Sequence, residues 1–386
     1  MINIYFVSVN NKNMKKLFKN KAFILLIPIT ILMIYSILNM INAGYIMNQY
    51  SNYYIKQLLW FAIGFFIVGL IYKFNIVNIF KYSYFLYALN VLLLILVLFF
   101  GKEVNGARAW FDLSYFSFQP SEFMKLSLIL TLANVSNSLK FRTIRNELIF
   151  IMKVIVLTLI PSILTFLQPD TGAVIIYFII ALVILFAARI RTRWFVISLG
   201  ILLVFSFSFF YFYHNYQDQF INIFGTSFFY RMDRLIEFSD GRGMQIENAL
   251  TAIGSAGWFG SGIRTVAIYF PEAPTDFIFA LSISNFGFFG AIIILLSYLF
   301  MFIILIKLFK KIKKKERKMF IIAFLGMFLY QTIQSVLMNI GLMPIIGITL
   351  PFLSYGGSST LLYFICIGLI IKFSRNQKEK YPNWIF

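Results

Sequence analysis

Ten long apolar runs, separated by short polar segments, divide the chain of 386 residues. A helix that crosses the hydrocarbon core of a bilayer needs about 20 mostly apolar residues. The pattern therefore predicts an all-α polytopic membrane protein, with one transmembrane domain over residues 1–386. The eighth run is long enough to bend, and Gly287 and Gly290 are candidate kinks. The ten expected transmembrane helices lie at about 22–41, 54–72, 82–100, 120–139, 148–167, 171–188, 194–213, 276–306, 319–342 and 358–373.

Composition supports the same class. Hydrophobic residues make up 60% of the chain and charged residues only 12%, whereas soluble domains carry about 25% charged residues. These values argue against an ordinary cytosolic enzyme and against a disordered protein. The chain has one cysteine, Cys366, and one histidine, His214. We therefore expect neither a disulfide framework nor a cysteine- or histidine-rich metal site.

The basic residues predict the orientation. With ten spans, 26 of the 34 Lys and Arg residues fall on the side that also holds both termini. Because cytoplasmic loops are enriched in Lys and Arg, both termini are expected in the cytoplasm. The net charge of +20 then reflects topology and attraction to anionic membrane lipids. No nucleic-acid partner is expected, since short intracellular loops do not gather basic residues on one folded surface.

The largest segment between runs covers residues 215–275, and the orientation places it outside the cell. A loop of this length in a compact protein is usually functional. Aromatic pieces at 228–230 and 258–259 suggest amphipathic segments that lie on the membrane. The alternative is a surface loop that is merely tethered by these aromatic side chains.

A second polar stretch leads into the fourth run. Pro120 suits the first turn of a helix, which places Glu122 and Lys125 on one helical face. One interpretation is a plain helix start, with Glu122 at the positive N-terminus and Lys125 reaching the surface. The other is a charged cluster that lines a cavity, because ionisable residues within a span are costly and usually functional. Lys125 favours the second interpretation, since a helix N-terminus does not attract a cation.

Asp276 stands at the start of the eighth run. It could simply support a helix start, with Thr275 as the N-cap. It could instead be a carboxylate at the membrane mouth, walled by aromatic residues and able to act as a general base. Apolar walls would raise its pKa and a helix N-terminus would lower it, so the sequence leaves the sign open.

A third stretch, residues 347–359, precedes the last run and contains Ser354 and Tyr355. Its glycine, proline and serine content argues against a regular helix. Non-helical backbone at membrane depth persists where protein or a water-filled cavity satisfies its polar groups. The stretch therefore predicts a re-entrant loop that lines the same cavity, or, alternatively, a simple packing element.

Six stretches, taken in their order along the chain, resemble motifs of the SEDS family of membrane proteins, which includes the RodA, FtsW and SpoVE types. The resemblance covers essentially the whole chain. The residues of the first two motifs are more similar to the RodA type than to the FtsW type. The stretches are Asn105-Gly106-Ala107-Arg108-Ala109-Trp110, Phe118-Gln119-Pro120-Ser121-Glu122-Phe123-Met124-Lys125, Leu167-Gln168-Pro169-Asp170-Thr171-Gly172, Ala252-Ile253-Gly254-Ser255, Pro271-Glu272-Ala273-Pro274-Thr275-Asp276-Phe277-Ile278-Phe279 and Leu350-Pro351-Phe352-Leu353-Ser354-Tyr355-Gly356-Gly357-Ser358-Ser359.

The resemblance implies a peptidoglycan glycosyltransferase that polymerises lipid II at the outer face of the bacterial plasma membrane. It also implies a class B penicillin-binding protein, a transpeptidase, as partner. Asp276 falls on the family's essential aspartate, which makes it the candidate catalytic residue. The candidate substrate-binding residues are Arg108, Trp110, Glu122, Lys125, Asp170, Ser354 and Tyr355.

The sequence departs from the family pattern near Asp276. Pro274 stands where a histidine is usual, Ser284-Asn285 replaces a usual acidic pair, and Asn248 stands where glutamine is common. The aspartate itself is kept, so activity is expected. The departures bear on the pKa of Asp276, on metal dependence and on the choice of partner.

As a mechanism we expect Asp276 to take the proton of the acceptor hydroxyl, while Arg108 and Lys125 hold diphosphate oxygens. Glu122 would orient Lys125, or coordinate a divalent ion together with Asp170; Mg²⁺ or Mn²⁺ would suit such carboxylates, although no dedicated metal cage is visible. Two alternatives stay open: a lipid II flippase, and a non-catalytic scaffold for the transpeptidase. The charges at the outer ends of the spans favour chemistry at the outer face over a path across the membrane.

Overall fold

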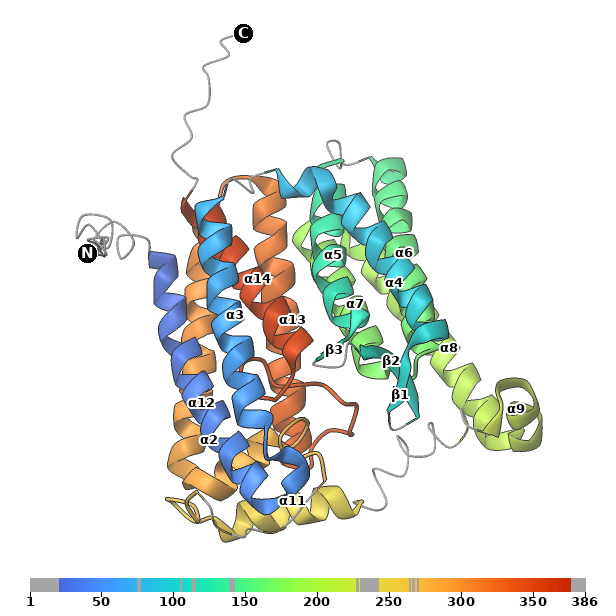
Figure 1. The fold of residues 1–386 in the computed structure, drawn as a ribbon. Helices are drawn as coiled ribbons and strands as arrows, with labels where there is room; N and C mark the ends of the chain where they lie inside the picture. Colours follow the sequence, from blue (N-terminus) through green and yellow to red (C-terminus); the bar gives the residue numbers. More distant parts are fainter. Residues whose placement is uncertain are drawn as a thin grey trace, which may run out of the picture.

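The computed structural model describes residues 21–74, 78–104, 106–112, 116–138, 143–226, 229, 243–263, 265, 268 and 271–375. Each of the ten predicted runs coincides with a long helix in this part of the chain (Figure 1). These helices are α2 (Leu26–Ile46), α3 (Tyr53–Lys73), α4 (Ser83–Phe100), α5 (Pro120–Val135), α6 (Ile144–Phe166), α7 (Thr171–Ala187), α8 (Thr192–Asn215), α12 (Ile278–Lys311), α13 (Lys315–Asn339) and α14 (Gly357–Arg375).

Shorter elements connect the long helices. A small antiparallel sheet follows α4, with its strands in the order β1-β2-β3. The other short elements are the 3₁₀ helices η1 (Lys21–Leu25), η2 (Asn48–Tyr50), η3 (Ile79–Tyr82) and η4 (Ser136–Ser138), the α-helices α9 (Gln217–Phe224) and α11 (Met244–Ser255), and the strands β1 (Lys102–Val104), β2 (Ala107–Asp112) and β3 (Ser117–Phe118).

Eight of the described helices are long and apolar enough to cross a membrane. The two remaining long helices, α5 and α7, have 16 and 17 residues. At 1.5 Å per residue they extend over about 24–26 Å, somewhat less than a hydrocarbon core of about 30 Å. The polytopic all-α class is confirmed, and the crossing of the membrane by all ten helices stays a prediction.

The long helices form two groups that meet along α5, α7 and α13 (Figure 1). Helix α5 is the central element, because 13 of its 16 residues are buried. The β-sheet, α9 and α11 lie at one end of the molecule, and the described chain ends near η1 and α14 lie at the other. We call the end with the sheet the outer end, since the sequence predicts it to face the cell exterior.

The predicted kink at Gly287 is confirmed. Gly287 has φ 67° and ψ −165° inside α12, which interrupts the helix there. The turn after α11 fills the gap, since Ser261 N–H donates to Ser284 O and Gly262 N–H donates to Asn285 O. Backbone groups that the break leaves free are therefore satisfied by another segment, as an apolar environment requires.

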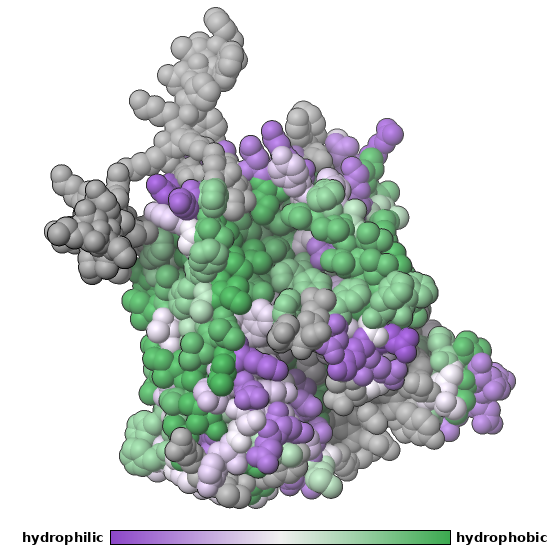
Figure 2. All heavy atoms as spheres, viewed as in Figure 1, coloured by the Kyte–Doolittle hydropathy of each residue, from purple (hydrophilic) through white to green (hydrophobic). Residues whose placement is uncertain are grey.

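Figure 2 shows apolar side chains over the flanks of the helices and hydrophilic side chains at their two ends. Many large apolar residues are exposed on α3, α4, α6, α8 and α12. Such a surface suits lipid as its solvent, which agrees with the predicted membrane location. The basic clusters at residues 12–19 and 378–380 and the charged residues at 231–242 lie outside the described residues, as does Arg264.

Candidate functional site

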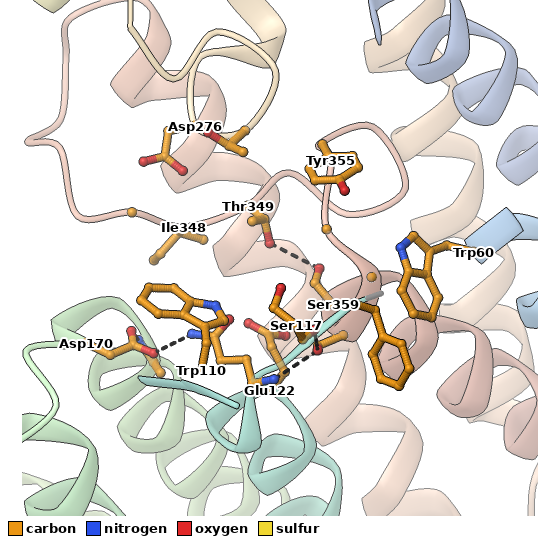
Figure 3. Close-up of a pocket in the computed structure, with 18 of the residues that line it drawn as sticks. Trp60, Trp110, Ser117, Glu122, Asp170, Asp276, Ile348, Thr349, Tyr355 and Ser359 are labelled. Atoms are coloured by element: carbon orange, nitrogen blue, oxygen red, sulfur yellow. Dashed lines mark hydrogen bonds between the residues drawn. The ribbon is translucent and has the colours of Figure 1, made fainter. Parts of the chain in front are cut away.

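A cavity of about 600 Å³ lies at the outer end of the molecule (Figure 3). Its walls come from the first turns of α3, α5, α7 and α14, the β-sheet, the turn before α12 and residues 347–349. Six of the candidate site residues line it, namely Trp110, Glu122, Lys125, Asp170, Tyr355 and Asp276. Five of the six stretches that resemble family motifs therefore contribute to one cavity.

Glu122 and Lys125 form a buried ion pair in the first turns of α5. Lys125 Nζ lies 2.6 Å from Glu122 Oε1, and the two side chains are only 2% and 8% exposed. Lys125 does not reach the surface, so the plain helix-start interpretation is wrong for it. The predicted charged cluster in a cavity is confirmed, but the pair is electrically neutral as a unit.

Asp170 fastens the start of α5 to the start of α7. Its Oδ1 accepts from the backbone N–H of Ala173 at 3.0 Å, which makes Asp170 the N-cap of α7. Its Oδ2 accepts from Gln119 Nε2 at 3.0 Å and from Ser121 Oγ at 2.9 Å. Three protein donors therefore occupy this carboxylate, although it faces the cavity.

Asp276 lies across the cavity from Trp110, Asp170 and Glu122 (Figure 3). In the described part of the chain, no donor forms a hydrogen bond or ion pair with its carboxylate. Burial raises the pKa of Asp276 to about 7, and the nearby negative charges of Glu272 and Asp170 add to this effect. The sequence left the sign open, and the burial and acidic neighbours of Asp276 in the structure favour a raised pKa.

Helix capping does not explain Asp276. The residue before α12 is Phe277, and no side chain caps this helix. Thr275 Oγ1 donates instead to Glu272 Oε2 at 2.7 Å. The capping interpretation of Thr275-Asp276 is therefore wrong.

Neighbouring segments hold the main chain around Asp276 from two sides. Asn339 Nδ2 donates to Asp276 O at 2.9 Å, and Asn339 Oδ1 accepts from Ala280 N–H at 2.8 Å. Ser354 Oγ donates to Thr275 O at 2.6 Å and accepts from Leu350 N–H at 2.8 Å. The carboxylate is thus presented on a fixed turn, although its own oxygens stay free to react.

Two candidate residues do not line the cavity. Ser354 is buried and supports the turn beside Asp276, so a substrate contact is not visible for it. Arg108 lies on β2 and is half-exposed, with Nη2 3.3 Å from Glu103 Oε2. It therefore does not join Lys125 and Asp276 in the way that the sequence suggested. The pairing of β1 with β2 explains the difference, since Arg108 lies opposite Glu103, whereas Trp110 lies opposite Lys102, which also lines the cavity.

Tyr355 completes the wall next to α3. Its ring stacks on Tyr53 with ring centroids 3.9 Å apart. Burial and the neighbouring Tyr53 raise the pKa of Tyr355 to about 12, so its hydroxyl is a hydrogen-bond donor at neutral pH.

Several lining residues were missed by the sequence reasoning, above all Lys56, Lys102, Glu272 and Gln331. Lys102 forms an ion pair with Asp112 at 2.7 Å. Lys56 is exposed in the first turn of α3 and has no acidic partner among the described residues. Its position inside an apolar run was a usable signal, because a charge in a span is costly without a function.

The described residues hold no group of three or more His, Cys, Asp or Glu side chains that could bind a metal ion. Asp170 is occupied by protein donors, and Glu122 uses one oxygen for Lys125. These side chains do not fit a metal cage made by protein alone.

Comparison with known proteins identifies relatives over nearly the whole chain. Residues 17–379 match the family model for FtsW, RodA and SpoVE, described as cell cycle proteins. The chain is 33% identical over 340 residues to a probable peptidoglycan glycosyltransferase FtsW of Wigglesworthia glossinidia brevipalpis, covering 84% of each chain. It is 31% identical over 356 residues to the protein of the same name from Acinetobacter baylyi, covering 88% of this chain and 84% of the relative.

Solved structures with the same fold are also found. One is a chain of a peptidoglycan synthase complex that coordinates polymerization and crosslinking, with TM-score 0.77, 25% identity and coverage of 92% of this chain and 98% of that one. Another is the rod shape determining protein RodA of Thermus thermophilus, with TM-score 0.66, 25% identity and coverage of 93% and 98%. The two relatives named above are of the FtsW type and the Thermus thermophilus structure is of the RodA type, so the lean toward RodA stays a prediction.

Proposed function

Because the chain belongs to the family of cell cycle proteins that includes FtsW, RodA and SpoVE, we propose that it is a peptidoglycan glycosyltransferase that polymerises lipid II. It is a multi-pass membrane protein of the bacterial inner membrane. The reaction would take place in the cavity at the outer end. The observation that carries this assignment is the unpaired carboxylate of Asp276 at the cavity, held on a fixed turn and with its pKa raised to about 7.

Glycosyl transfer from lipid II joins a sugar hydroxyl to an anomeric carbon that carries a lipid diphosphate. The hydroxyl oxygen forms the new bond to carbon, the bond from carbon to the diphosphate breaks, and the hydroxyl proton must be removed. A general base works best when its pKa lies near the working pH. Asp276 meets this condition, since a carboxyl with its ordinary pKa would be a much weaker base.

The departing diphosphate needs positive charge and hydrogen-bond donors. Lys56, Lys102 and Lys125 line the cavity together with the hydroxyl of Tyr355. Lys102 and Lys125 are already paired with Asp112 and Glu122, so Lys56 has the charge that is least compensated. Trp110 offers a flat apolar surface against which a sugar ring could pack. Arg108 is left out of this mechanism, because it pairs with Glu103 away from the cavity.

In our proposal, a divalent cation takes part in the chemistry only together with the substrate. Mg²⁺ is usually bound by one or two carboxylates together with phosphate oxygens and water. We therefore propose that any Mg²⁺ or Mn²⁺ required for activity arrives with the diphosphate.

We also propose a class B penicillin-binding protein as the partner. The structural neighbour in a peptidoglycan synthase complex supports this proposal, since that complex couples polymerization with crosslinking. A glycan strand made at the outer end would emerge where an extracytoplasmic transpeptidase could act on it.

The decisive experiment is glycan synthesis from purified lipid II by the full chain, with and without its transpeptidase. We expect strands from the unaltered chain and none from Asp276→Asn, which keeps the shape and removes the base. The matched control is Asp218→Asn, an exposed aspartate on α9 outside the cavity. Polymer from Asp276→Asn would contradict the mechanism. Translocation without polymer would indicate a flippase, and neither activity would indicate a scaffold.

A further inference from the structure

The three lysines that line the cavity differ in their surroundings, and this difference separates their roles. Resting on the proposed function, we infer that Lys56 binds the diphosphate of the donor lipid, and that the donor lies along α3 while the acceptor lies beside Asp276. The inference assigns the two substrate positions, which the sequence could not distinguish.

Two of the cavity lysines already have acidic partners. Lys125 Nζ lies 2.6 Å from Glu122 Oε1 in a pair that is almost fully buried. Lys102 Nζ lies 2.7 Å from Asp112 Oδ2. A diphosphate bound at either lysine would also face the carboxylate of its partner. Lys56 has no such partner in the described part of the chain, so its positive charge is available to a ligand.

Acidic side chains line the cavity away from Trp60. Asp276 and Asp170 lie on opposite walls, both distant from Trp60 (Figure 3), and neither forms an ion pair within the described residues. Glu272 also lines the cavity, and it acts electrostatically on Tyr53 as well as on Asp276. A ligand with two or three negative charges is repelled by these carboxylates and attracted toward Lys56. A neutral sugar hydroxyl pays no such penalty beside Asp276.

The residues around Lys56 suit a lipid-linked donor. Tyr53, Lys56 and Trp60 follow one another on a single face of α3, as spacings of three and four residues predict. Trp60 lies about 6 Å deeper than Lys56 along the helix, and it packs on Phe116 with ring centroids 5.6 Å apart. Trp60 and Asp276 lie at opposite ends of the cavity (Figure 3). A diphosphate at Lys56 could thus continue into an apolar chain that passes Trp60 toward the lipid-exposed flank of α3.

The packing of Trp60 is specific. A side-chain carbon at Gly357 would lie 2.4 Å from the Trp60 ring, so the absence of a side chain at the start of α14 leaves room for the indole. The aromatic surface below Lys56 is therefore a built feature of the cavity wall.

Direct binding tests the inference without requiring turnover. The full chain with Asp276→Asn, reconstituted in vesicles, is titrated with a labelled polyprenyl diphosphate and with the corresponding monophosphate. Since a hydrogen bond to a charged group is worth about 1.5–3 kcal/mol, Lys56→Gln should weaken diphosphate binding about 10-fold or more. The monophosphate should be affected less, and Lys56→Arg should retain most of the affinity.

Two control variants show whether the effect is local. Lys73→Gln removes an exposed lysine at the other end of α3 and should leave binding unchanged. Lys102→Gln should weaken binding less than threefold, because Lys102 already has a carboxylate partner. Unaltered diphosphate binding in Lys56→Gln would overturn the inference, as would an equal loss in Lys73→Gln or no diphosphate binding by the parent chain.

The outcome is separate from that of the proposed function. A chain that binds diphosphate through Lys56 but makes no glycan would contradict the polymerase assignment and leave this inference standing. A chain that makes glycan with unchanged kcat/KM after Lys56→Gln would contradict this inference and leave the assignment standing.

Discussion

At the scale of single residues, the chemistry of Asp276 depends on what surrounds it more than on where it lies in the helix. Its carboxylate lacks a donor among the described residues, whereas the carboxylate of Asp170 accepts three hydrogen bonds. Both line the same cavity. The same side chain therefore serves as a structural cap in one place and as a candidate base in the other.

The raised pKa of Asp276 predicts a pH dependence. The carboxylate is the active form, so polymerisation should fall as the pH drops below about 7, approaching tenfold per pH unit. Glu272→Gln removes a negative charge near Asp276 and keeps an oxygen that accepts from Thr275. Because the charge of Glu272 raises the pKa of Asp276, the acidic limb of the pH profile of kcat/KM should shift to lower pH. Glu103→Gln, at an exposed ion pair outside the cavity, should leave the profile unchanged. An unshifted limb in Glu272→Gln would contradict the assigned cause.

The buried pair of Glu122 and Lys125 predicts non-additive stability effects. Breaking a buried ion pair at one end costs about 3–5 kcal/mol, because a charge is left without compensation. Glu122→Gln should therefore be strongly destabilising, and adding Lys125→Met should recover much of the loss. Thermal unfolding in detergent measures the stability of the single variant and of the double variant. Asp112→Asn breaks the exposed pair with Lys102 and should cost no more than about 1 kcal/mol; equal losses at the two sites would refute this view.

At the scale of elements, the interruption of α12 has a structural partner. Gly287 has positive φ, and a side-chain carbon there would lie 2.4 Å from Gly260 N. The turn after α11 passes directly over the break and hydrogen-bonds to it. The start of α12, which carries the Asp276 turn, is thus oriented by another part of the outer loop.

This arrangement predicts that Gly287→Ala is destabilising. The backbone conformation of Gly287, with φ 67° and ψ −165°, is open almost only to glycine and costs other residues about 1–3 kcal/mol. The close approach of Gly260 adds to this cost. The variant should unfold at a lower temperature and polymerise lipid II more slowly. Gly69→Ala on α3 meets nothing within 4 Å and should be neutral or slightly stabilising. Equal effects of the two substitutions would contradict the proposed contact.

The elements themselves could be predicted because membrane helices leave long apolar runs. The re-entrant stretch was predicted in part: residues 342–356 are non-helical, but Gly357, Ser358 and Ser359 already belong to α14. The β-sheet was not predicted, since its strands have only 3, 6 and 2 residues and carry no long alternating pattern.

The site was predictable to a similar degree. Ionisable residues in or next to predicted spans, such as Lys125 and Asp276, identified most of the site, because placing such groups in a membrane costs free energy. The pairing of Arg108 with Glu103 and the support of the Asp276 turn by Ser354 depend on contacts that form only in the folded chain. A single sequence does not encode such contacts in any local pattern, so these roles became visible only in the structure.

At the scale of the whole molecule, the assignment depends on one orientation, with the cavity outside and the basic loops inside. Labelling tests it cleanly, because Cys366 is the only cysteine of the chain and is buried. In a Cys366→Ser background, Asp218→Cys on α9 should react with a membrane-impermeant maleimide in intact spheroplasts. Lys313→Cys, exposed between α12 and α13, should react only after the membrane is opened. An odd number of crossings between these two sites is required for that result. Reaction of both sites from outside would place the cavity and the basic loop on one side, and chemistry at the outer face could then not be argued from this fold.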